Sequence, residues 1–380
     1  MRHAKEPVRV LHVVPGLERG GTERFLERLL AHLARSHAAR VRSSVVVLKD
    51  EGAIGRALRA RGIPVRALAL RGLDDVARAL PHRSRIARGA RPHVVQGWLA
   101  VGNATASVVG HALAVPVAWN ERNSGGALPF TWPTALADRL APIVPAPVCV
   151  VCLSEGARRR ARAQRSDVET RVIENGYDDA RFVFDARARR DVRAERAIDD
   201  DAPVVVAVQR FSPEKDPRAL TRAFSEVRAR LPRAHLLLVG EGNDARNAAL
   251  TALVEERDRA HVHLLGARDD VARVLSAGDV FVSASRAEGV PNALAEALLV
   301  ERVAVATDVG DTRLLACNAL SLVAPGDVRA LVEGTARALE EPAAERHARG
   351  RAGRAHVSAR FSLASTAEQY VRLWSSIGGA

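Results

Sequence analysis

The feature that most constrains the fold is a regular alternation of short apolar runs and amphipathic segments along the 380 residues of the chain. The apolar runs are rich in Val, Leu and Ala, which is typical of strands buried on both faces of a parallel sheet. Between them, segments such as Thr22–Arg35 repeat apolar side chains at helical spacing. The pattern predicts an α/β chain with parallel sheets covered by helices, and the length suggests two doubly wound domains.

The alternation runs through both halves of the chain. The expected strands are Val8–Val14, Ser44–Leu48, Pro64–Leu70, His93–Gln96, Val117–Asn120, Val148–Leu153, Thr170–Glu174, Val204–Val208, His235–Val239, His261–Leu265, Val280–Ser283, Val303–Ala306 and Ser321–Val323. A join is expected in the Arg- and Asp-rich stretch Asp185–Asp201. We therefore place an N-terminal domain at residues 1–184 and a C-terminal domain at 185–362. The remaining residues, 363–380, should form a helix that returns to the N-terminal domain.

The positive charge is concentrated in one half of the chain. The formal net charge is +13, and only Lys5, Lys49 and Lys215 of the 57 basic residues are lysines. Residues 1–182 hold 29 Lys and Arg against 16 Asp and Glu, whereas residues 183–380 hold 28 of each. This asymmetry indicates that the N-terminal half meets a nucleic acid, a membrane surface or a charged substrate, although an arginine-rich coding bias gives the same count.

Three segments argue against membrane-spanning, secreted and disulfide-bonded classes. The segment Pro92–Asn120 has no charged residue, but its histidines, amides, glycines and proline make it too polar for hydrocarbon. The apolar run Val8–Val14 is followed by Pro and Gly, so we expect no signal peptide. Cys149 and Cys152 lie in a strand-like run, where a spacing of three puts the thiols on opposite faces. We therefore expect buried, unpaired thiols in a reducing cytoplasm.

The first candidate ligand loop follows the first expected strand, where residues 15–22 read PGLERGGT. Gly20 and Gly21 allow a ligand to approach the backbone closely, and the helix that follows favours an anion at its N-terminus. A glycine turn without a ligand is the alternative interpretation.

The second candidate loop follows the strand Val204–Val208, where residues 209–216 read QRFSPEKD. Arg210 and Lys215 emerge where a strand meets a helix, and two cations at such a point are suited to a diphosphate. Lys215 is also one of only three lysines in a chain that otherwise uses arginine. Two solvated cations are the alternative.

The third candidate loop follows the strand Val280–Ser283 and leads to a helix that is expected to begin near Pro291. Glu288 ends the loop segment, and Glu296 lies one turn into the helix, where its carboxylate can reach the hydroxyls of a ribose. The amides expected to face a phosphate are those of Gly289, Val290, Asn292 and Ala293. A capped helix with an ordinary surface glutamate is the alternative.

The spacing of these two glutamates carries a resemblance. Glu288 and Glu296 are separated by seven residues, and this E-x7-E pattern resembles the donor-binding motif of retaining glycosyltransferases of the GT-B fold. Further motifs follow in the family's order: NGYD at 175–178, RFSPEKD at 210–216, LVGEGN at 238–243, VHLLGARDDV at 262–271 and ATDVGDTRLL at 306–315. The chain is thus similar to a family 4 glycosyltransferase, a group that builds bacterial surface polysaccharides and glycolipids.

The resemblance implies a role for each candidate. Arg210 and Lys215 would neutralise the diphosphate of a nucleotide-sugar donor as it leaves. Glu288 would contact the donor sugar, Glu296 the ribose, and Gly21 the phosphates. A UDP-sugar is the favoured donor and a GDP-sugar the second choice. Such enzymes retain the anomeric configuration and are generally metal-independent, so we expect no metal and no cofactor.

One position departs from the family pattern. Many relatives carry a histidine after the strand that corresponds to Val117–Trp119, whereas this chain reads NERN at 120–123. That sequence is similar to a subgroup with Arg-Asn at this place, which implies that Arg122 or Asn123 takes over the role of the histidine. The D-x-D triplet Asp199–Asp201 lies apart from the other motifs, and we interpret it as a polar turn.

The expected partners are a nucleotide sugar and a glycan or lipid-phosphate-linked acceptor. We expect a cytoplasmic protein that attaches peripherally to the inner membrane face through Arg78–Arg91 and Arg158–Arg165, with the apolar stretch Ala127–Val148 between them. A nucleotide-sugar epimerase, a phosphorylase and a donor-binding subunit without catalysis are the alternatives. A nucleic-acid-binding protein is disfavoured because aromatic residues make up only 4% of the chain.

Overall fold

The computed structural model describes residues 6–18, 20–70, 91–122 and 145–379, which form two compact units. Within the described residues, unit 1 comprises the chain up to residue 176 together with 363–379, and unit 2 comprises 177–362. The predicted α/β class with two parallel sheets is confirmed. No helix in this described part is both long and apolar enough to cross a bilayer.

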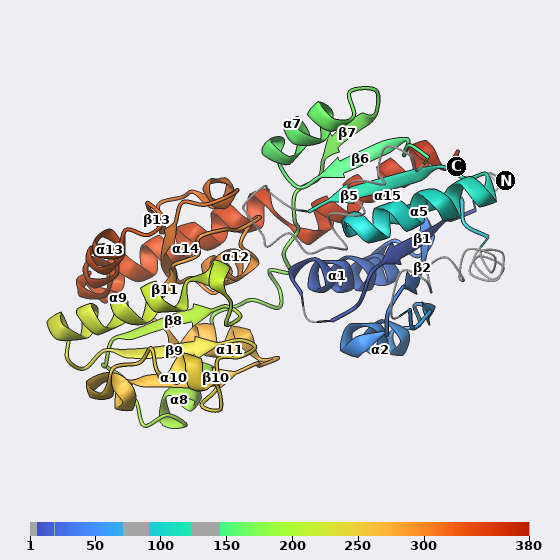
Figure 1. The fold of residues 1–380 in the computed structure, drawn as a ribbon. Coiled ribbons are helices and arrows are strands. Elements are labelled where there is room, and N and C mark those ends of the chain that lie inside the picture. The colour runs from blue at the N-terminus through green and yellow to red at the C-terminus, as the bar shows by residue number, and fades with distance from the viewer. Residues whose placement is uncertain (1–5, 19, 71–90, 123–144, 380) are drawn as a thin grey trace. The chain divides into compact units, whose positions relative to one another are not determined.

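Unit 1 is built on one parallel sheet (Figure 1). Its described strands are β1 (Val8–Val14), β2 (Val41–Val47), β3 (Val65–Ala67), β4 (Val94–Gly97), β5 (Val117–Glu121), β6 (Cys149–Cys152) and β7 (Glu169–Val172). They lie in the order β3-β2-β1-β4-β5-β6-β7. The helices are α1 (Gly21–Ser36), α2 (Gly52–Ala60), α5 (Leu99–Leu113), α7 (Glu155–Gln164) and α15 (Leu363–Ile377).

Both faces of the unit 1 sheet are covered. Side chains of α1, α2 and α15 share one apolar core with β1 and β2, whereas those of α5 and α7 share a second core. Helix α15, from the far end of the sequence, packs against α1 and β1. The expectation that the C-terminal helix returns to the N-terminal domain therefore agrees with the observed packing.

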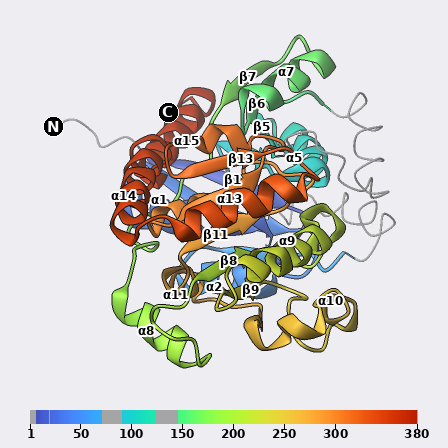
Figure 2. The same cartoon turned by 90° about the vertical axis from the view of Figure 1, so that its left-hand side faces the viewer.

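Unit 2 has a second parallel sheet, in the order β10-β9-β8-β11-β12-β13. Its described strands are β8 (Val204–Val208), β9 (His235–Val239), β10 (Val262–Gly266), β11 (Val280–Ser283), β12 (Val303–Thr307) and β13 (Leu320–Val323). The helices are α8 (Ala186–Ala194), α9 (Pro217–Arg230), α10 (Ala248–Thr251), α11 (Val271–Ala277), α12 (Asn292–Leu299), α13 (Val328–Glu340) and α14 (Ala343–Arg360). Helix α9 packs on α13, and α11 contacts α8 and α12, so separate helix groups cover the sheet (Figure 2).

The boundary between the units differs from the expected one. It lies between Gly176 and Tyr177 rather than between 184 and 185, because residues 177–184 are bonded to unit 2. The backbone N–H of Tyr177 donates to the carbonyl oxygen of Phe361 over 2.8 Å. Arg354 donates to the carbonyls of Asp179 and Phe182 over 2.8 and 2.6 Å.

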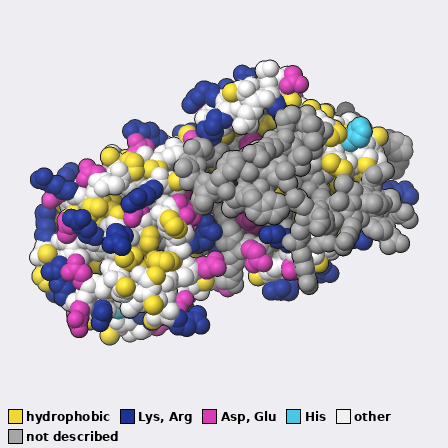
Figure 3. Space-filling view, in the orientation of Figure 1, with side chains coloured by type: hydrophobic (Ala, Val, Ile, Leu, Met, Phe, Trp, Pro, Cys, Tyr) yellow, Lys and Arg dark blue, Asp and Glu magenta, His cyan; other side chains and the backbone are white. Residues whose placement is uncertain are grey.

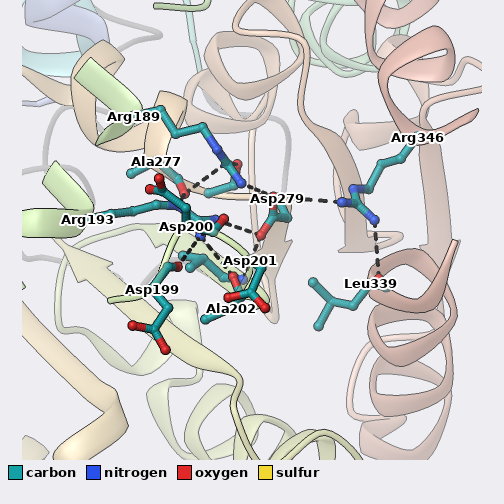
Figure 4. A network of polar contacts seen from close by, with 12 residues as sticks. Arg189, Arg193, Asp199, Asp200, Asp201, Ala202, Ala277, Asp279, Leu339 and Arg346 are labelled. Carbon is teal, nitrogen blue, oxygen red and sulfur yellow. Dashed lines mark hydrogen bonds and ion pairs between the residues drawn. The ribbon is translucent and has the colours of Figure 1, made fainter. Parts of the chain in front are cut away.

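The expected linker Asp185–Asp201 is largely ordered structure inside unit 2. Its helix α8 carries Arg189 and Arg193, which bind the buried Asp279 carboxylate over 2.8 and 2.9 Å (Figure 4). Arg193 also donates to the carbonyls of Asp199, Asp200 and Ala202, each over 2.9 Å. Because an unpaired buried charge is costly, these bonds fix α8 against the amino end of β11.

The strand order puts a topological switch point in each sheet. In unit 1 the crossover reverses direction between β1 and β4, and in unit 2 it does so between β8 and β11. Ligands of such sheets bind outside the carboxyl ends of the strands at this point. The loops after β8 and β11 are therefore the first place to look for a site in unit 2.

Candidate functional site

The loop after β8 displays one cation and buries part of another. The Arg210 side chain is 57% exposed, and its guanidinium pairs with Glu214 over 3.2 Å. Lys215 ends a 3₁₀ turn, Pro213–Lys215, and its side chain is only 19% exposed. Asp216 then has a φ of 44° and caps α9, where its carboxylate accepts from the amide of Ala219. The tight turn and the cap hold both cations at the carboxyl edge of the sheet.

Glu214 is held in its ionised form within this loop. Burial opposes ionisation of its carboxyl, but its own backbone amide and the positive charges of Arg210 and Lys215 keep its pKa below the ordinary value. Arg210 therefore faces a permanent carboxylate near neutral pH. An anionic ligand would compete with Glu214 for the exposed guanidinium.

Lys215 and Glu288 meet although they lie on different loops. The Lys215 Nζ lies 2.5 Å from Glu288 Oε1, and the Ser285 hydroxyl donates to the same oxygen over 2.7 Å. Both charged side chains are partly buried, so their attraction is screened less than on the surface. The structure thus brings together two of the residues predicted for the donor site.

The two loops are also joined through their backbones. The amide of Arg286 donates to the carbonyl of Glu214 over 2.8 Å, and the Arg286 guanidinium binds Asp216 over 2.6 Å. These bonds tie the segment before Glu288 to the turn that carries Lys215. The relative positions of the two loops are therefore set before any ligand arrives.

A third loop supports Glu288 from behind. Gly310, in the segment predicted as ATDVGD, has a φ of 56°, and a Cβ there would lie 2.0 Å from the carbonyl oxygen of Glu288. Only glycine allows this approach. The amide of Asp311 then donates to the carbonyl of Gly289 over 3.1 Å. The glycine thus allows the loop after β12 to pack against Glu288 and Gly289.

The predicted anion-binding helix starts one residue later than expected. Helix α12 begins at Asn292, and Pro291 is its N-cap residue rather than its first residue. Val290 is buried, while the other residues predicted to face a phosphate are partly exposed: Gly289, Asn292 and Ala293. Glu296 is on the second turn of α12 and is partly exposed. Their contacts with a ligand stay predictions.

The glycine candidates of unit 1 lie at the start of α1. Gly20 is the N-cap residue and Gly21 the first residue of the helix. A Cβ on Gly20 would lie 2.1 Å from Glu23 Oε2, so the Glu23 carboxylate folds back over this turn. An anion at this helix start would meet that negative charge first. Contact of Gly20 and Gly21 with phosphates stays a prediction.

Arg122 is a buried residue of unit 1, with 7% of its surface exposed. Its guanidinium lies 4.2 Å from the centre of the Phe25 ring and donates to Asn175 Oδ1. The charge of Arg122 also acts on the buried Tyr370, whose pKa is raised by burial. These contacts tie together α1, α15 and the end of unit 1, and they give Arg122 a structural role. Asn123 lies outside the described residues.

A buried polar network beside Arg122 was not expected from the sequence. Trp98 donates to His12 Nδ1 over 3.2 Å, and Trp374 donates to Gln96 over 3.0 Å. Burial lowers the pKa of His12 to about 3, so the ring is a neutral partner. The two pairs join positions 86 and 278 apart, so no local sequence pattern predicts them. The usable signal is the apolar face of the last helix, which carries Trp374.

Two motifs are structural, as the sequence indicated. Cys149 and Cys152 are free and buried, they belong to the cores on opposite sheet faces, and burial raises their pKa values to about 11 and 12. The Asp199–Asp201 triplet is a turn whose outer carboxylates pair with Arg233. Among the described residues, no group of three or more His, Cys, Asp or Glu could hold a metal ion.

Comparison with known proteins agrees with this geometry. Residues 202–341, which contain Arg210, Lys215, Glu288 and Glu296, match the family described as Glycosyl transferases group 1. This part of unit 2 therefore resembles a group 1 glycosyl transferase domain. The resemblance found in the sequence is confirmed at this level, whereas membership of family 4 and retention of configuration stay predictions.

Two curated relatives have names that mention lipopolysaccharide or a phosphatidylinositol mannoside. The chain is 32% identical over 239 residues to the lipopolysaccharide core biosynthesis glycosyltransferase LpsE of Rhizobium meliloti, covering 60% of this chain and 64% of that protein. It is 29% identical over 215 residues to the GDP-mannose-dependent monoacylated alpha-(1-6)-phosphatidylinositol monomannoside mannosyltransferase of Corynebacterium glutamicum, covering 54% and 55%. The chain thus spans less than two thirds of the length of either relative.

Solved structures show the fold over nearly the whole chain. The HepE protein of Anabaena, in complex with UDP and glucose, matches with a TM-score of 0.82 at 19% identity, covering 97% of this chain and all of that one. A sucrose-phosphate synthase of Thermosynechococcus elongatus matches with a TM-score of 0.78 at 21% identity, covering 98% and 99%. The two sheets and their helices are those of the GT-B fold.

Proposed function

We propose that this protein is a glycosyltransferase that moves a sugar from a nucleoside-diphosphate sugar to a glycan or lipid-linked acceptor. The observation that carries the proposal is the Lys215–Glu288 pair at the switch point of unit 2, inside the group 1 glycosyl transferase domain. A cation for a diphosphate and a carboxylate for sugar hydroxyls lie side by side there. Unit 2 then binds the donor, and unit 1 serves the acceptor.

Each residue of the site has a defined task in this proposal. Lys215 and Arg210 stabilise the negative charge that develops on the diphosphate as the glycosidic bond breaks. Glu288 accepts hydrogen bonds from the donor sugar, and Glu296 accepts them from the ribose. The amides at the start of α12 add donors for the phosphate oxygens. The reaction retains the anomeric configuration and proceeds without a metal ion or other cofactor, because side-chain cations supply the charge.

A UDP-sugar is the donor that we favour. Support comes from HepE, whose structures contain UDP and UDP-glucose, while the mannosyltransferase relative is named for GDP-mannose. A thermal-shift panel of nucleotide sugars tests the proposal, because a ligand at 100 times its Kd adds about 2.7 kcal/mol of stability. We expect one nucleotide sugar to raise the melting temperature of the wild type. No shift with any member of the panel would overturn the proposal.

The same panel can be paired with two chemical tests. Turnover in the presence of a chelator should equal turnover without it, and a loss on chelation that an added metal restores would contradict the metal-free reaction. The anomeric configuration of the product should match that of the donor. An inverted product would leave the donor site standing but exclude the retaining mechanism.

We propose further that the acceptor is presented at an anionic membrane surface. Helix α7 supports this, because its exposed arginines include Arg159, Arg160 and Arg162, and basic side chains gather over it on the surface (Figure 3). On unit 2, by contrast, basic and acidic side chains are interspersed on the face shown (Figure 3). The other expected contact segments, residues 78–90 and 127–144, lie outside the described residues.

Co-sedimentation with anionic vesicles tests this second step. Binding at low salt that weakens as salt rises is the expected result, since each basic residue near such a surface contributes about 1 kcal/mol. The variant R159E/R162E should bind less than wild type, whereas reversal of two exposed arginines of unit 2, R222E/R257E, should change binding little. Equal loss in both variants would point to net charge alone rather than to α7.

A further inference from the structure

The carboxylate of Glu288 is held by one of its two oxygens. Both of its bonds, from Lys215 Nζ at 2.5 Å and from the Ser285 hydroxyl at 2.7 Å, end at Oε1. Within the described part of the chain, no hydrogen bond or ion pair reaches Oε2. A carboxylate oxygen with both lone pairs open is a strong acceptor, so Oε2 is the atom that a ligand hydroxyl can use.

Ser285 is itself firmly fixed. Only 1% of its surface is exposed, and its hydroxyl lies 3.2 Å from that of Ser283 at the end of β11. Its carbonyl accepts a hydrogen bond from the hydroxyl of Thr307, at the end of the neighbouring strand β12, over 2.5 Å. Ser285 is therefore held by the ends of β11 and β12, and its hydroxyl in turn holds the carboxylate of Glu288.

When a donor binds, the Lys215 bond to Glu288 is more easily broken than the Ser285 bond. A diphosphate carries more charge than a carboxylate, so it would draw the flexible ammonium group toward itself. The Ser285 bond would then be the one that keeps Oε1 in place. Without it, the carboxylate could follow the lysine or rotate about its side-chain torsions.

We propose that Ser285 is a positioning residue that keeps Oε2 of Glu288 aimed at the hydroxyls of the donor sugar. The inference rests on the proposed function and names a residue that acts through Glu288 rather than on the ligand itself. It predicts that loss of the Ser285 hydroxyl raises the Kd of the complete nucleotide sugar but not that of its nucleoside diphosphate. A residue needed only for folding would affect both ligands alike.

The experiment compares two ligands in four proteins. Calorimetry gives the Kd of the nucleotide sugar that stabilises the wild type and of its own nucleoside diphosphate, for wild type, S285A, S285T and E288A. We expect S285A to weaken the nucleotide sugar about tenfold, the factor that one ordinary hydrogen bond supplies, and to leave the nucleoside diphosphate within twofold. S285T keeps the hydroxyl and should restore most of the loss.

A double mutant and a matched control complete the test. Adding S285A to E288A should cost little more than E288A alone, because the serine has lost the group that it positions. Ser276→Ala removes another buried serine hydroxyl of unit 2, which bonds to the carbonyl of Ala272 and to the amide of Asp185. It should leave the ratio of the two Kd values unchanged.

The outcomes separate this inference from the proposed function. If the wild type binds neither ligand, the proposed function fails and the role of Ser285 falls with it. If the wild type binds both and S285A weakens them equally, or weakens neither, the donor site stands and the positioning role is wrong. An additive loss in the double mutant would also overturn it.

Discussion

The two units share one topology but use its switch point differently. In unit 2 the loops after β8 and β11 end in charged side chains that are open to solvent in part, Arg210, Lys215 and Glu288. In unit 1 the strands around the switch point hold His12 and Gln96, which bond to the indoles of Trp98 and Trp374. One edge therefore displays charged, partly exposed side chains, and the other is occupied by its own aromatic residues.

The difference shows that strand order fixes where a site can form and residue chemistry decides whether it does. Both sheets place the carboxyl ends of two strands next to each other at a switch point of the strand order. In unit 1, helix α15 contributes Tyr370 and Trp374, both fully buried, to the core beneath that region. The comparison predicts that damage to unit 1 appears first as lost stability, whereas damage to the site in unit 2 appears first as lost turnover.

The largest expected effect is on the stability of unit 1. Trp374→Ala removes a fully buried indole and leaves Gln96 Oε1 without its donor, which should lower the free energy of unfolding by about 3–5 kcal/mol. Tryptophan fluorescence in urea measures this selectively, because residues 177–362 contain no tryptophan. Gln369→Ala, at an exposed position of the same helix, should shift the midpoint little. A shift of equal size in both variants would mean that α15 contributes only helical propensity.

The next effect is on turnover in unit 2. Lys215→Ala should reduce turnover about 10²- to 10³-fold, the usual cost of removing one group that stabilises transition-state charge. The melting temperature should change little, because Ser285 still holds Glu288. Arg222→Ala, on the exposed face of α9, is the matched control and should stay within twofold of wild type. A Lys215 variant with normal turnover would remove this residue from the catalytic site.

Much of this comparison could be predicted from the sequence. Val-rich runs predict the strands because parallel strands are buried on both faces. The helical segment expected at Thr22–Arg35 lies within α1, Gly21–Ser36, one residue short of it at each end. The E-x7-E spacing is local, so it identified Glu288 and Glu296 in unit 2. Helix α15 could be recognised from its apolar face, which Tyr370 and Trp374 carry.

Contacts between distant residues could not be predicted in the same way. The pairing of Lys215 with Glu288 joins positions 73 apart, and that of Gln96 with Trp374 joins positions 278 apart. Neither has a local pattern. The Asp185–Asp201 stretch was misread as a linker because its charges indicate solvent, whereas Arg193 is buried against Asp279. Charged residues are reliable surface markers only when no partner is near in space.

A smaller effect separates the two roles of Arg122. The residue is predicted from the resemblance to act on the donor, yet its guanidinium lies on the Phe25 ring and bonds to Asn175. Arg122→Ala should lower the stability of unit 1 by roughly 2 kcal/mol, through the lost cation–π contact and hydrogen bond. The test measures both unfolding, by tryptophan fluorescence in urea, and turnover. Turnover is assayed at urea concentrations below the unfolding midpoint of the variant, where the protein is folded. Lost turnover with unchanged stability would favour the donor role instead.

The smallest effect concerns acid sensitivity of unit 2. His235 and His263 lie at the amino ends of β9 and β10, with 3.0 Å between their ring nitrogens, near His261, Arg228 and Arg196. Burial first, and then these positive neighbours, lower the pKa of both rings to about 4. The unfolded chain, with an ordinary pKa near 6.5, therefore binds more protons between pH 6.5 and 4. The free energy of unfolding of unit 2 should fall as the pH is lowered through this window and stay level above it.

His263→Gln should flatten that dependence, because it removes one titrating ring and the repulsion on the other. Unfolding of unit 2 is followed by circular dichroism. Its transition is the one that tryptophan fluorescence does not report, since unit 2 has no tryptophan. His111→Gln, at an exposed position of α5 in unit 1, serves as the control and should keep the wild-type slope. Both residues are partly exposed, so water reduces the effect, and it should be smaller than that of Arg122→Ala. If the slope persists in His263→Gln, groups other than these two rings cause the acid sensitivity of unit 2.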